Sequence, residues 1–221
     1  MVRPVFQKGY GMIQIDNLSL TIRKSNILTD INLALESGKI HGLIGRNGSG
    51  KTMLMKCICG FVHPTLGTVQ IDGKYIGKDI DFPEDLGVII ETPEFIPYMS
   101  GFQNLRLLAK GRNRIGDKEI HEVMELVNLD PKSRLHVKKY SLGMKQRLGI
   151  AQAIMEDPKL LVLDEPLSAL DEDGVRDVRK ILLDLKQRGI TIILSSHNAE
   201  DIHVLCDDVY RLQKGCLVSD S

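Results

Sequence analysis

The sequence lacks the features of a membrane-spanning or secreted chain. No apolar run in its 221 residues approaches the roughly 18 residues of a membrane-crossing helix. The longest runs, such as Leu160–Leu163 and Ile190–Leu194, have the length of strands. Residues 1–12 contain no apolar segment typical of a secretory signal, so we expect none. If the protein works at a membrane, we expect it to dock there through a partner.

An excess of charge is also missing. Lys and Arg together number 29, as do Asp and Glu, which gives a formal net charge of zero. This balance excludes a basic field over the whole protein, although it leaves room for a local basic patch, and we expect no nucleic-acid partner. The four cysteines form no CxxC pair, which argues against a zinc knuckle. We expect free thiols in a reducing cytosol.

The sequence does contain strand-length apolar runs that alternate with helix-length periodic segments. Strands are predicted at 12–15, 31–35, 40–44, 68–71, 86–90, 160–163, 190–194, 209–212 and 217–218. Helices are predicted at 51–59, 102–109, 117–128, 143–156, 175–188 and 199–206. The alternation predicts an α/β fold with a largely parallel sheet between helices. The purely helical pattern from 102 to 157 predicts a second lobe inserted into the sheet domain.

Residues Gly45–Thr52 match the phosphate-loop pattern GxxxxGK[ST]. The loop lies between a predicted strand and a predicted helix, as phosphate binding requires. Backbone N–H groups would point at one anion, assisted by the positive end of the helix dipole. Lys51 would reach the β- and γ-phosphates, and the Thr52 hydroxyl would bind Mg²⁺. The alternative is a glycine-rich turn that binds nothing. The other predicted ATP-binding residues of this loop are Asn47, Gly48, Ser49 and Gly50.

Three polar residues follow predicted buried strands. Asp164 and Glu165 come directly after the apolar run that ends at Leu163, and ligands of parallel sheets bind beyond such strand ends. We expect Asp164 to bind Mg²⁺ and Glu165 to act as the general base for an attacking water. His197 follows the strand at 190–194, and we expect it to bond the γ-phosphate. The alternatives are a surface turn before Pro166 and a structural histidine.

These motifs, in this order and spacing, resemble those of ABC transporter ATP-binding subunits. The discriminating segment is Tyr140–Arg147, which resembles the ABC signature LSGGQxQR. The resemblance covers essentially the whole chain. It implies that Ser141 and Gly143 contact ATP held by another subunit, and that residues 168–171 form a loop that passes between subunits and ends at Asp171. The expected partner is therefore a second copy or a homologous ATPase subunit.

The resemblance also implies a fold and an activity. The fold is a P-loop NTPase (RecA-like) core at residues 1–91 and 158–221, with a mostly parallel sheet and antiparallel N-terminal strands. Residues 92–157 are the inserted α-helical subdomain that carries the signature. The implied activity is Mg²⁺-dependent ATP hydrolysis that powers a separate membrane permease. The subunit would be cytoplasmic and peripheral on the inner face of the cell membrane.

The sequence departs from the family pattern in the signature and at the position that contacts the adenine base. Leu142 and Met144 replace a glycine and a glutamine of the signature, while Ser141 and Gly143 remain. The aromatic residue that stacks on adenine in the family falls near Ile22 in this sequence. Tyr10 is an alternative source of that ring.

Glu91 replaces the family's glutamine after the strand at 86–90, and we expect it to contact the metal. Together with Pro93, Pro97 and Tyr98, it resembles the subgroup of bacitracin and lantibiotic export and immunity transporters. We expect export of a peptide antibiotic, lantibiotic or other amphipathic compound. The same loop predicts that Phe95, Tyr98 and Met99 line the groove for the permease, or else pack the helical lobe.

Two other functions use similar motifs. One is a soluble ABC ATPase that acts on nucleic acid or ribosomes. Such proteins carry long coiled-coil insertions or two cassettes, whereas this chain has a short insert and one cassette. The other is a scaffold such as those of iron–sulfur cluster assembly. Intact Lys51, Asp164, Glu165 and His197 speak against a loss of hydrolysis, although a soluble partner remains open.

Overall fold

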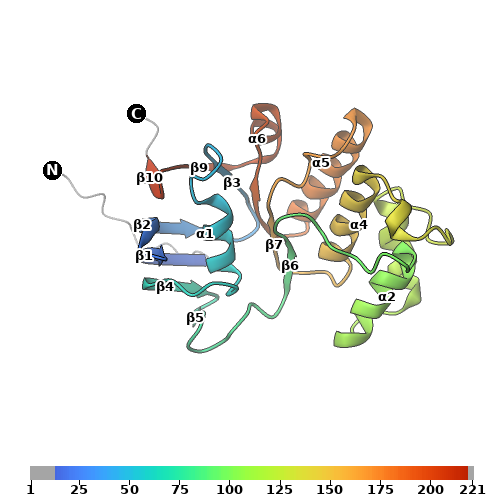
Figure 1. The fold of residues 1–221 in the computed structure, drawn as a ribbon, viewed down its shortest axis with the longest axis horizontal. Helices are drawn as coiled ribbons and strands as arrows, with labels where there is room; N and C mark the ends of the chain where they lie inside the picture. Colours follow the sequence, from blue (N-terminus) through green and yellow to red (C-terminus); the bar gives the residue numbers. More distant parts are fainter. Residues whose placement is uncertain (1–12, 219–221) are drawn as a thin grey trace. The chain divides into compact units, whose positions relative to one another are not determined.

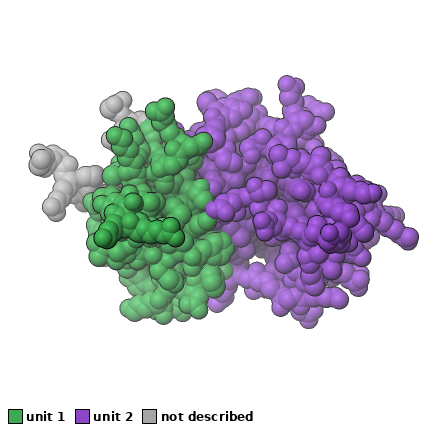
Figure 2. Space-filling view, in the orientation of Figure 1, with its two compact units in different colours: residues 1–37, 45–83, 211–221 green, residues 38–44, 84–210 purple. Residues whose placement is uncertain are grey.

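The computed structural model describes residues 13–218, which form two compact units. Residues 13–37, 45–83 and 211–218 belong to unit 1, and residues 38–44 and 84–210 belong to unit 2. Figure 2 shows unit 1 in green and unit 2 in purple. Among the described residues, no helix has the length and apolarity needed to cross a membrane.

Unit 1 is built on an antiparallel sheet. Its strands are β1 (Ile13–Ile22), β2 (Ser25–Leu35), β4 (Leu66–Ile71) and β5 (Lys74–Tyr75), in the order β2-β1-β4-β5 (Figure 1). Alternate residues of β1 are buried, as a sheet with one covered face requires. Helix α1 (Lys51–Ile58) contacts β2. Strand β10 (Cys216–Val218) pairs with the last residues of β9 (Asp208–Gln213).

The predicted strands at 12–15 and 31–35 are too short. β1 continues to Ile22, and β2 begins at Ser25. The apolar alternation was interrupted because the pairing shifts register between Ile15 and Leu18, where Asn17 has a positive φ of 49°. The Asn17 N–H donates to Asn32 Oδ1 at 2.8 Å, which holds this irregularity. Met12, the predicted first residue of the strand, lies outside the described residues.

Unit 2 contains the predicted parallel sheet. Strands β3 (Ile40–Ile44), β8 (Thr191–Ser195), β7 (Leu160–Leu163) and β6 (Leu86–Ile89) lie side by side in that order and run parallel. The start of β9 adds a strand beside β3. Every residue of β7 and β8 is buried, which explains their continuous apolar runs.

The other regular elements of unit 2 are helices. They are α2 (Gly101–Arg112), α3 (Asp117–Leu126), α4 (Leu142–Ile154), α5 (Glu172–Gln187), α6 (Ala199–Leu205) and a 3₁₀ turn at Val137–Lys139. Ser100 starts α2 with a capping box that it forms with Gln103. The described residues from 102 to 157 form helices without a strand, as predicted. The 3₁₀ turn was missed because three residues carry no readable period. The predicted α/β fold is confirmed.

The four cysteines are free thiols, as predicted. Burial raises the pKa of Cys57 and Cys59, both at the C-terminal end of α1, to about 12. Burial also raises the pKa of Cys206 to about 12. These thiols therefore stay protonated at neutral pH and act as small apolar side chains.

Candidate functional site

The phosphate loop in unit 1 has a backbone that only glycine adopts easily. Gly45, Gly48 and Gly50 have φ angles of 150°, 77° and 109°. A Cβ atom on Gly45 would lie 2.3 Å from the carbonyl oxygen of Leu212, and one on Gly50 would lie 2.8 Å from Leu28 Cδ2. Gly45 is therefore required by close packing against backbone as well as by its backbone angle, whereas at Gly50 the backbone angle is the main constraint.

Lys51 and Ser49 give this loop the character of an anion site. Lys51 is 7% exposed, and its Nζ donates to the Gly45 carbonyl at 2.8 Å. No described carboxylate forms an ion pair with it. The buried Ser49 hydroxyl has no hydrogen-bond partner among the described residues. A buried cation, an unsatisfied hydroxyl and the N-terminus of α1 fit the oxygens of a phosphate chain. Thr52 is the next helical residue and is half-buried.

In unit 2, Ser195 joins Asp164 and Glu165, which follow β7. The Ser195 hydroxyl donates to Asp164 Oδ1 at 2.6 Å and accepts from the Glu165 N–H at 3.0 Å. Ser195 is fully buried at the end of β8. Glu165 has a positive φ of 52°, which is uncommon for a residue with a side chain. Sequence reasoning gave Ser195 no role, although a serine that ends a buried apolar strand was a signal.

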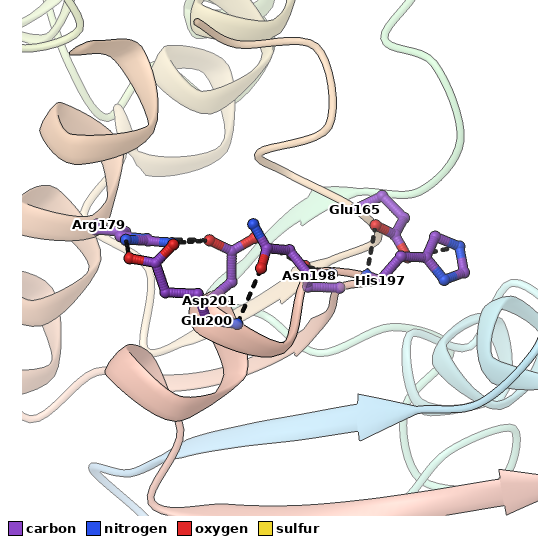
Figure 3. Close-up of polar contacts among 7 residues, drawn as sticks. Glu165, Arg179, His197, Asn198, Glu200 and Asp201 are labelled. Carbon is purple, nitrogen blue, oxygen red and sulfur yellow. Dashed lines mark hydrogen bonds and ion pairs between the residues drawn. The ribbon is translucent and has the colours of Figure 1, made fainter. Parts of the chain in front are cut away.

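Glu165 and His197 are brought together, as Figure 3 shows. His197 Nε2 lies 3.1 Å from Glu165 Oε1, and the His197 N–H donates to Glu165 Oε2 at 3.3 Å. Among the described residues, Glu165 Oε1 accepts no hydrogen bond, so the approach of His197 Nε2 to it is a close contact and not a hydrogen bond. The glutamate is half-buried and the histidine exposed. A carboxylate beside an imidazole can accept a proton from water at this place.

The segment that follows Glu165 is held by hydrogen bonds within unit 2. Gln146 on α4 is buried and donates to the Pro166 carbonyl at 2.9 Å. The Ser168 hydroxyl donates to the Glu165 carbonyl at 3.0 Å. Asp171 caps α5 by accepting from the Gly174 N–H at 3.0 Å. Sequence reasoning missed the anchoring role of Gln146.

The signature segment forms the N-terminus of α4. Ser141 is the N-cap, and its hydroxyl accepts from the Met144 N–H at 3.1 Å. A Cβ atom on Gly143 would lie 3.2 Å from the Ala169 carbonyl, so a small residue is favoured there. Ser141 and Leu142 are exposed. The arrangement presents a helix N-terminus on the surface of unit 2, next to the segment that leads to Asp171.

The remaining predicted residues are exposed or half-buried, or lie outside the described part. Ile22 ends β1 in unit 1 and is exposed, while Tyr10 lies outside the described residues. Glu91, after β6, is exposed and has a positive φ of 65°. Tyr98 is exposed, with Lys138 Nζ 4.5 Å from its ring centre. Phe95 and Met99 are half-buried.

Comparisons with known proteins agree on one family. Residues 28–168 match the model of the ABC transporter family. The uncharacterized ABC transporter ATP-binding protein YybJ of Bacillus subtilis (strain 168) is 46% identical over 206 residues, 93% of this chain and 94% of that protein. The bacitracin transport ATP-binding protein BcrA of Enterococcus faecalis is 40% identical over 211 residues, 95% of this chain and 68% of that protein.

A lantibiotic transport protein and a solved ATP-binding cassette are also similar to this chain. The lantibiotic transport ATP-binding protein SrtF of Streptococcus pyogenes is 34% identical over 208 residues, 94% of this chain and 89% of that protein. The ATP-binding cassette MJ0796, solved as a dimer in a post-hydrolysis state with ADP and phosphate, superposes with a TM-score of 0.85 at 22% identity. The match covers 95% of this chain and 98% of that chain. At this identity the structural likeness shows the fold alone.

Proposed function

Because this chain belongs to the family of ABC transporter ATP-binding proteins, which bind and hydrolyse ATP, we propose that it powers export through a separate membrane permease. The cargo would be a peptide antibiotic, a lantibiotic or another amphipathic compound. This proposal is supported by the sequence identity of 40% to the bacitracin protein BcrA and of 34% to the lantibiotic protein SrtF, in both cases over almost the whole chain.

The phosphate loop of unit 1 is proposed to hold the triphosphate. Among the described residues, Lys51 Nζ donates to the Gly45 carbonyl, and the other two donors of its ammonium group suit the β- and γ-phosphate oxygens. Residues Asn47–Gly50 offer backbone N–H groups, and Ser49 adds a buried hydroxyl. These groups neutralise and orient the phosphates before any chemistry takes place. Ile22 is proposed to pack on the base without stacking an aromatic ring.

Mg²⁺ is the proposed metal. The described residues contain no group of three or more His, Cys, Asp or Glu side chains that could hold a metal alone. This fits Mg²⁺, which commonly uses one or two carboxylates together with substrate phosphates. Thr52, Asp164 and Glu91 are the proposed ligands. Ser195 orients the Asp164 carboxylate by donating to its Oδ1 at 2.6 Å. When bound, Mg²⁺ offsets the charge that develops on the phosphates.

Glu165 is the proposed general base, and His197 the proposed donor to the γ-phosphate. The Ser195 hydroxyl accepts from the Glu165 N–H, and the Ser168 hydroxyl donates to the Glu165 carbonyl. These two hydrogen bonds fix the backbone position from which the Glu165 side chain extends. The His197 side chain lies 3.1 Å from the Glu165 carboxylate and is proposed to restrict its orientation. A positioned carboxylate can then take the proton of the attacking water.

A second copy, or a homologous ATPase subunit, is the proposed partner in an ATP sandwich. The exposed N-terminus of α4, with Ser141 and Gly143, suits the γ-phosphate of ATP held by the partner. Asp171 would lie in the segment that passes between the subunits. In this proposal residues 1–91 and 158–221 form the ATP-binding core, and residues 92–157 form the helical subdomain.

The permease contact is proposed for the segment that carries Phe95, Tyr98 and Met99. Tyr98 is exposed on a loop with Pro93 and Pro97, and Phe95 packs partly against the core of unit 2. This placement suits a loop anchored at one end and open to a partner at the other. The subunit would then be cytoplasmic and peripheral on the inner face of the membrane.

Co-expression with a six-helix membrane protein, sought in the reading frame adjacent to this gene, tests the proposal. Cells that carry both proteins should resist bacitracin or a lantibiotic better than cells that carry the permease with Glu165→Gln. Purified complex should show ATPase activity that rises when the compound is added. Equal sensitivity of the two strains to every bacitracin and lantibiotic tested would reject this class of cargo.

A further inference from the structure

The backbone on both sides of His197 is tied to one carboxylate. Ser196 is buried, and its hydroxyl donates to Asp201 Oδ2 at 2.8 Å. The same hydroxyl accepts from the Asn198 N–H at 3.1 Å. Residues 196 and 198 flank the histidine, so the turn that carries His197 is held through Ser196 to Asp201 on α6. Asn198 also caps α6 by accepting from the Glu200 N–H at 2.9 Å.

The Asp201 carboxylate is held in turn by an arginine on another helix. Asp201 is 3% exposed, and its Oδ1 accepts from Arg179 Nε at 3.0 Å and from Nη2 at 2.5 Å. Arg179 lies on α5, and its Nη1 donates to Glu200 Oε1 at 3.0 Å (Figure 3). Hydrogen bonds to Glu200 and Asp201 raise the pKa of Arg179 further, so the guanidinium stays charged. Both oxygens of Asp201 are therefore occupied.

We propose that the ion pair between half-buried Arg179 and buried Asp201 is a positioning device for the ATPase reaction, which fixes His197 through Ser196 and Asn198. Arg179 and Asp201 do not contact the reacting groups in this account. They set the place of the histidine, which in turn lies 3.1 Å from Glu165. The inference rests on the proposed role of His197 in hydrolysis.

Simple stabilisation of the fold is the rival explanation for this ion pair. Removing one partner of a buried pair leaves the other charge uncompensated, and this destabilises a protein whatever its function. A test must therefore use a readout that stability alone does not change. Coupling to His197 is such a readout, because residues that act through one another show non-additive effects.

The experiment compares Asp201→Asn and Arg179→Lys in the wild type and in a His197→Ala background. In the wild type we expect each to lower kcat by about 10- to 100-fold, since hydrogen bonds to charged groups are lost or weakened. The KM for ATP should change by less than about threefold, because the phosphate loop is untouched. In the His197→Ala background each change should lower the residual turnover by less than about twofold.

The matched control is Arg176→Gln on the same helix. Arg176 forms an ion pair with Asp173 at 2.7 Å, but these side chains are 75% and 76% exposed. It should leave kcat unchanged, because exposed pairs contribute little. Thermal unfolding with and without MgATP shows which variants are folded. If Asp201→Asn does not fold, the Arg179→Lys cycle alone decides.

The outcomes separate the inference from the proposed function. Equal losses of turnover in both backgrounds would show a purely structural ion pair and overturn the inference. Wild-type kcat in folded Asp201→Asn and Arg179→Lys would overturn it as well. Wild-type turnover in His197→Ala would instead reject the proposed role of His197, and the inference that rests on it would fall with it.

Discussion

The phosphate loop of unit 1 and the carboxylate site of unit 2 are built in different ways. In the loop, backbone angles and close packing shape the site, and the backbone of Leu212 leaves no space for a side chain at Gly45. In the second site, polar side chains make the contacts: the Ser195 hydroxyl binds the Asp164 carboxylate and the Glu165 backbone N–H, and Asp201 binds the Ser196 hydroxyl. A site shaped by the backbone of one loop can therefore be recognised from a short sequence motif. A site held together by side chains draws on residues that are far apart in the sequence.

The largest expected effect lies in the side-chain-built site. Glu165→Gln should lower kcat by about 10²- to 10⁴-fold, the usual cost of losing a general base. An amide keeps the shape of the side chain but cannot take the proton of water. Phosphate release by the purified variant measures this effect. Turnover near that of the wild type would show that Glu165 is not the general base and that the proton transfer does not take place at this site of unit 2.

The next prediction probes the backbone-built site. Gly45→Ala should weaken ATP binding by at least about tenfold, because its Cβ would lie 2.3 Å from the Leu212 carbonyl and the φ angle is unfavourable. Gly48→Ala is the control, since no atom lies within 4 Å of a Cβ there and only its positive φ is strained. It should weaken binding less. Calorimetric titration with ATP compares the two, and equal losses would show that packing against Leu212 is unimportant.

Ser195→Ala should lower kcat by about tenfold. The change leaves the partly buried Glu165 N–H without the Ser195 acceptor and removes the donor to Asp164, and a fully buried unsatisfied group costs about 1–3 kcal/mol. Ser168→Ala, which removes a hydrogen bond to the carbonyl of the same glutamate from an exposed position, is the control and should have a smaller effect. If the two serine variants have the same turnover, burial does not decide the contribution of these hydroxyls.

The smallest effect is expected at Glu91. Glu91→Gln should keep the basal ATPase rate within about tenfold of the wild type, because attraction of the carboxylate to Mg²⁺ and its repulsion from phosphate partly cancel. Glu91→Ala should impair export more than basal hydrolysis. ATPase assays on the isolated subunit and resistance assays in cells measure the two. A loss of basal hydrolysis as severe as that of Glu165→Gln would place Glu91 in the chemistry.

The sequence predicted most of the fold and the main motifs. Continuous apolar runs predicted β7 and β8 because both strands are buried on two faces. The glycines of the phosphate loop could be predicted from the sequence because each has a positive φ angle, which is a local property of the backbone. The full lengths of β1 and β2 were missed where the register shifts near Asn17.

What the sequence could not predict depends on contacts between distant positions. Ser195 and Glu165 are 30 residues apart, and Arg179 and Asp201 are 22 apart. Neither pair has a periodic or local pattern, because the sheet and the helices bring them together. A serine or an aspartate at such positions looks like any other polar residue until the fold is known.

Equilibrium binding of ATP to Lys51→Ala and Glu165→Gln, measured side by side in the presence of Mg²⁺, tests most directly the division of the site into binding and chemistry. Lys51→Ala should bind about 10- to 100-fold more weakly than the wild type, since it loses hydrogen bonds from a charged group. Glu165→Gln should bind ATP within about threefold of the wild type. Wild-type affinity in Lys51→Ala, or a loss of binding in Glu165→Gln as large as that in Lys51→Ala, would contradict the account.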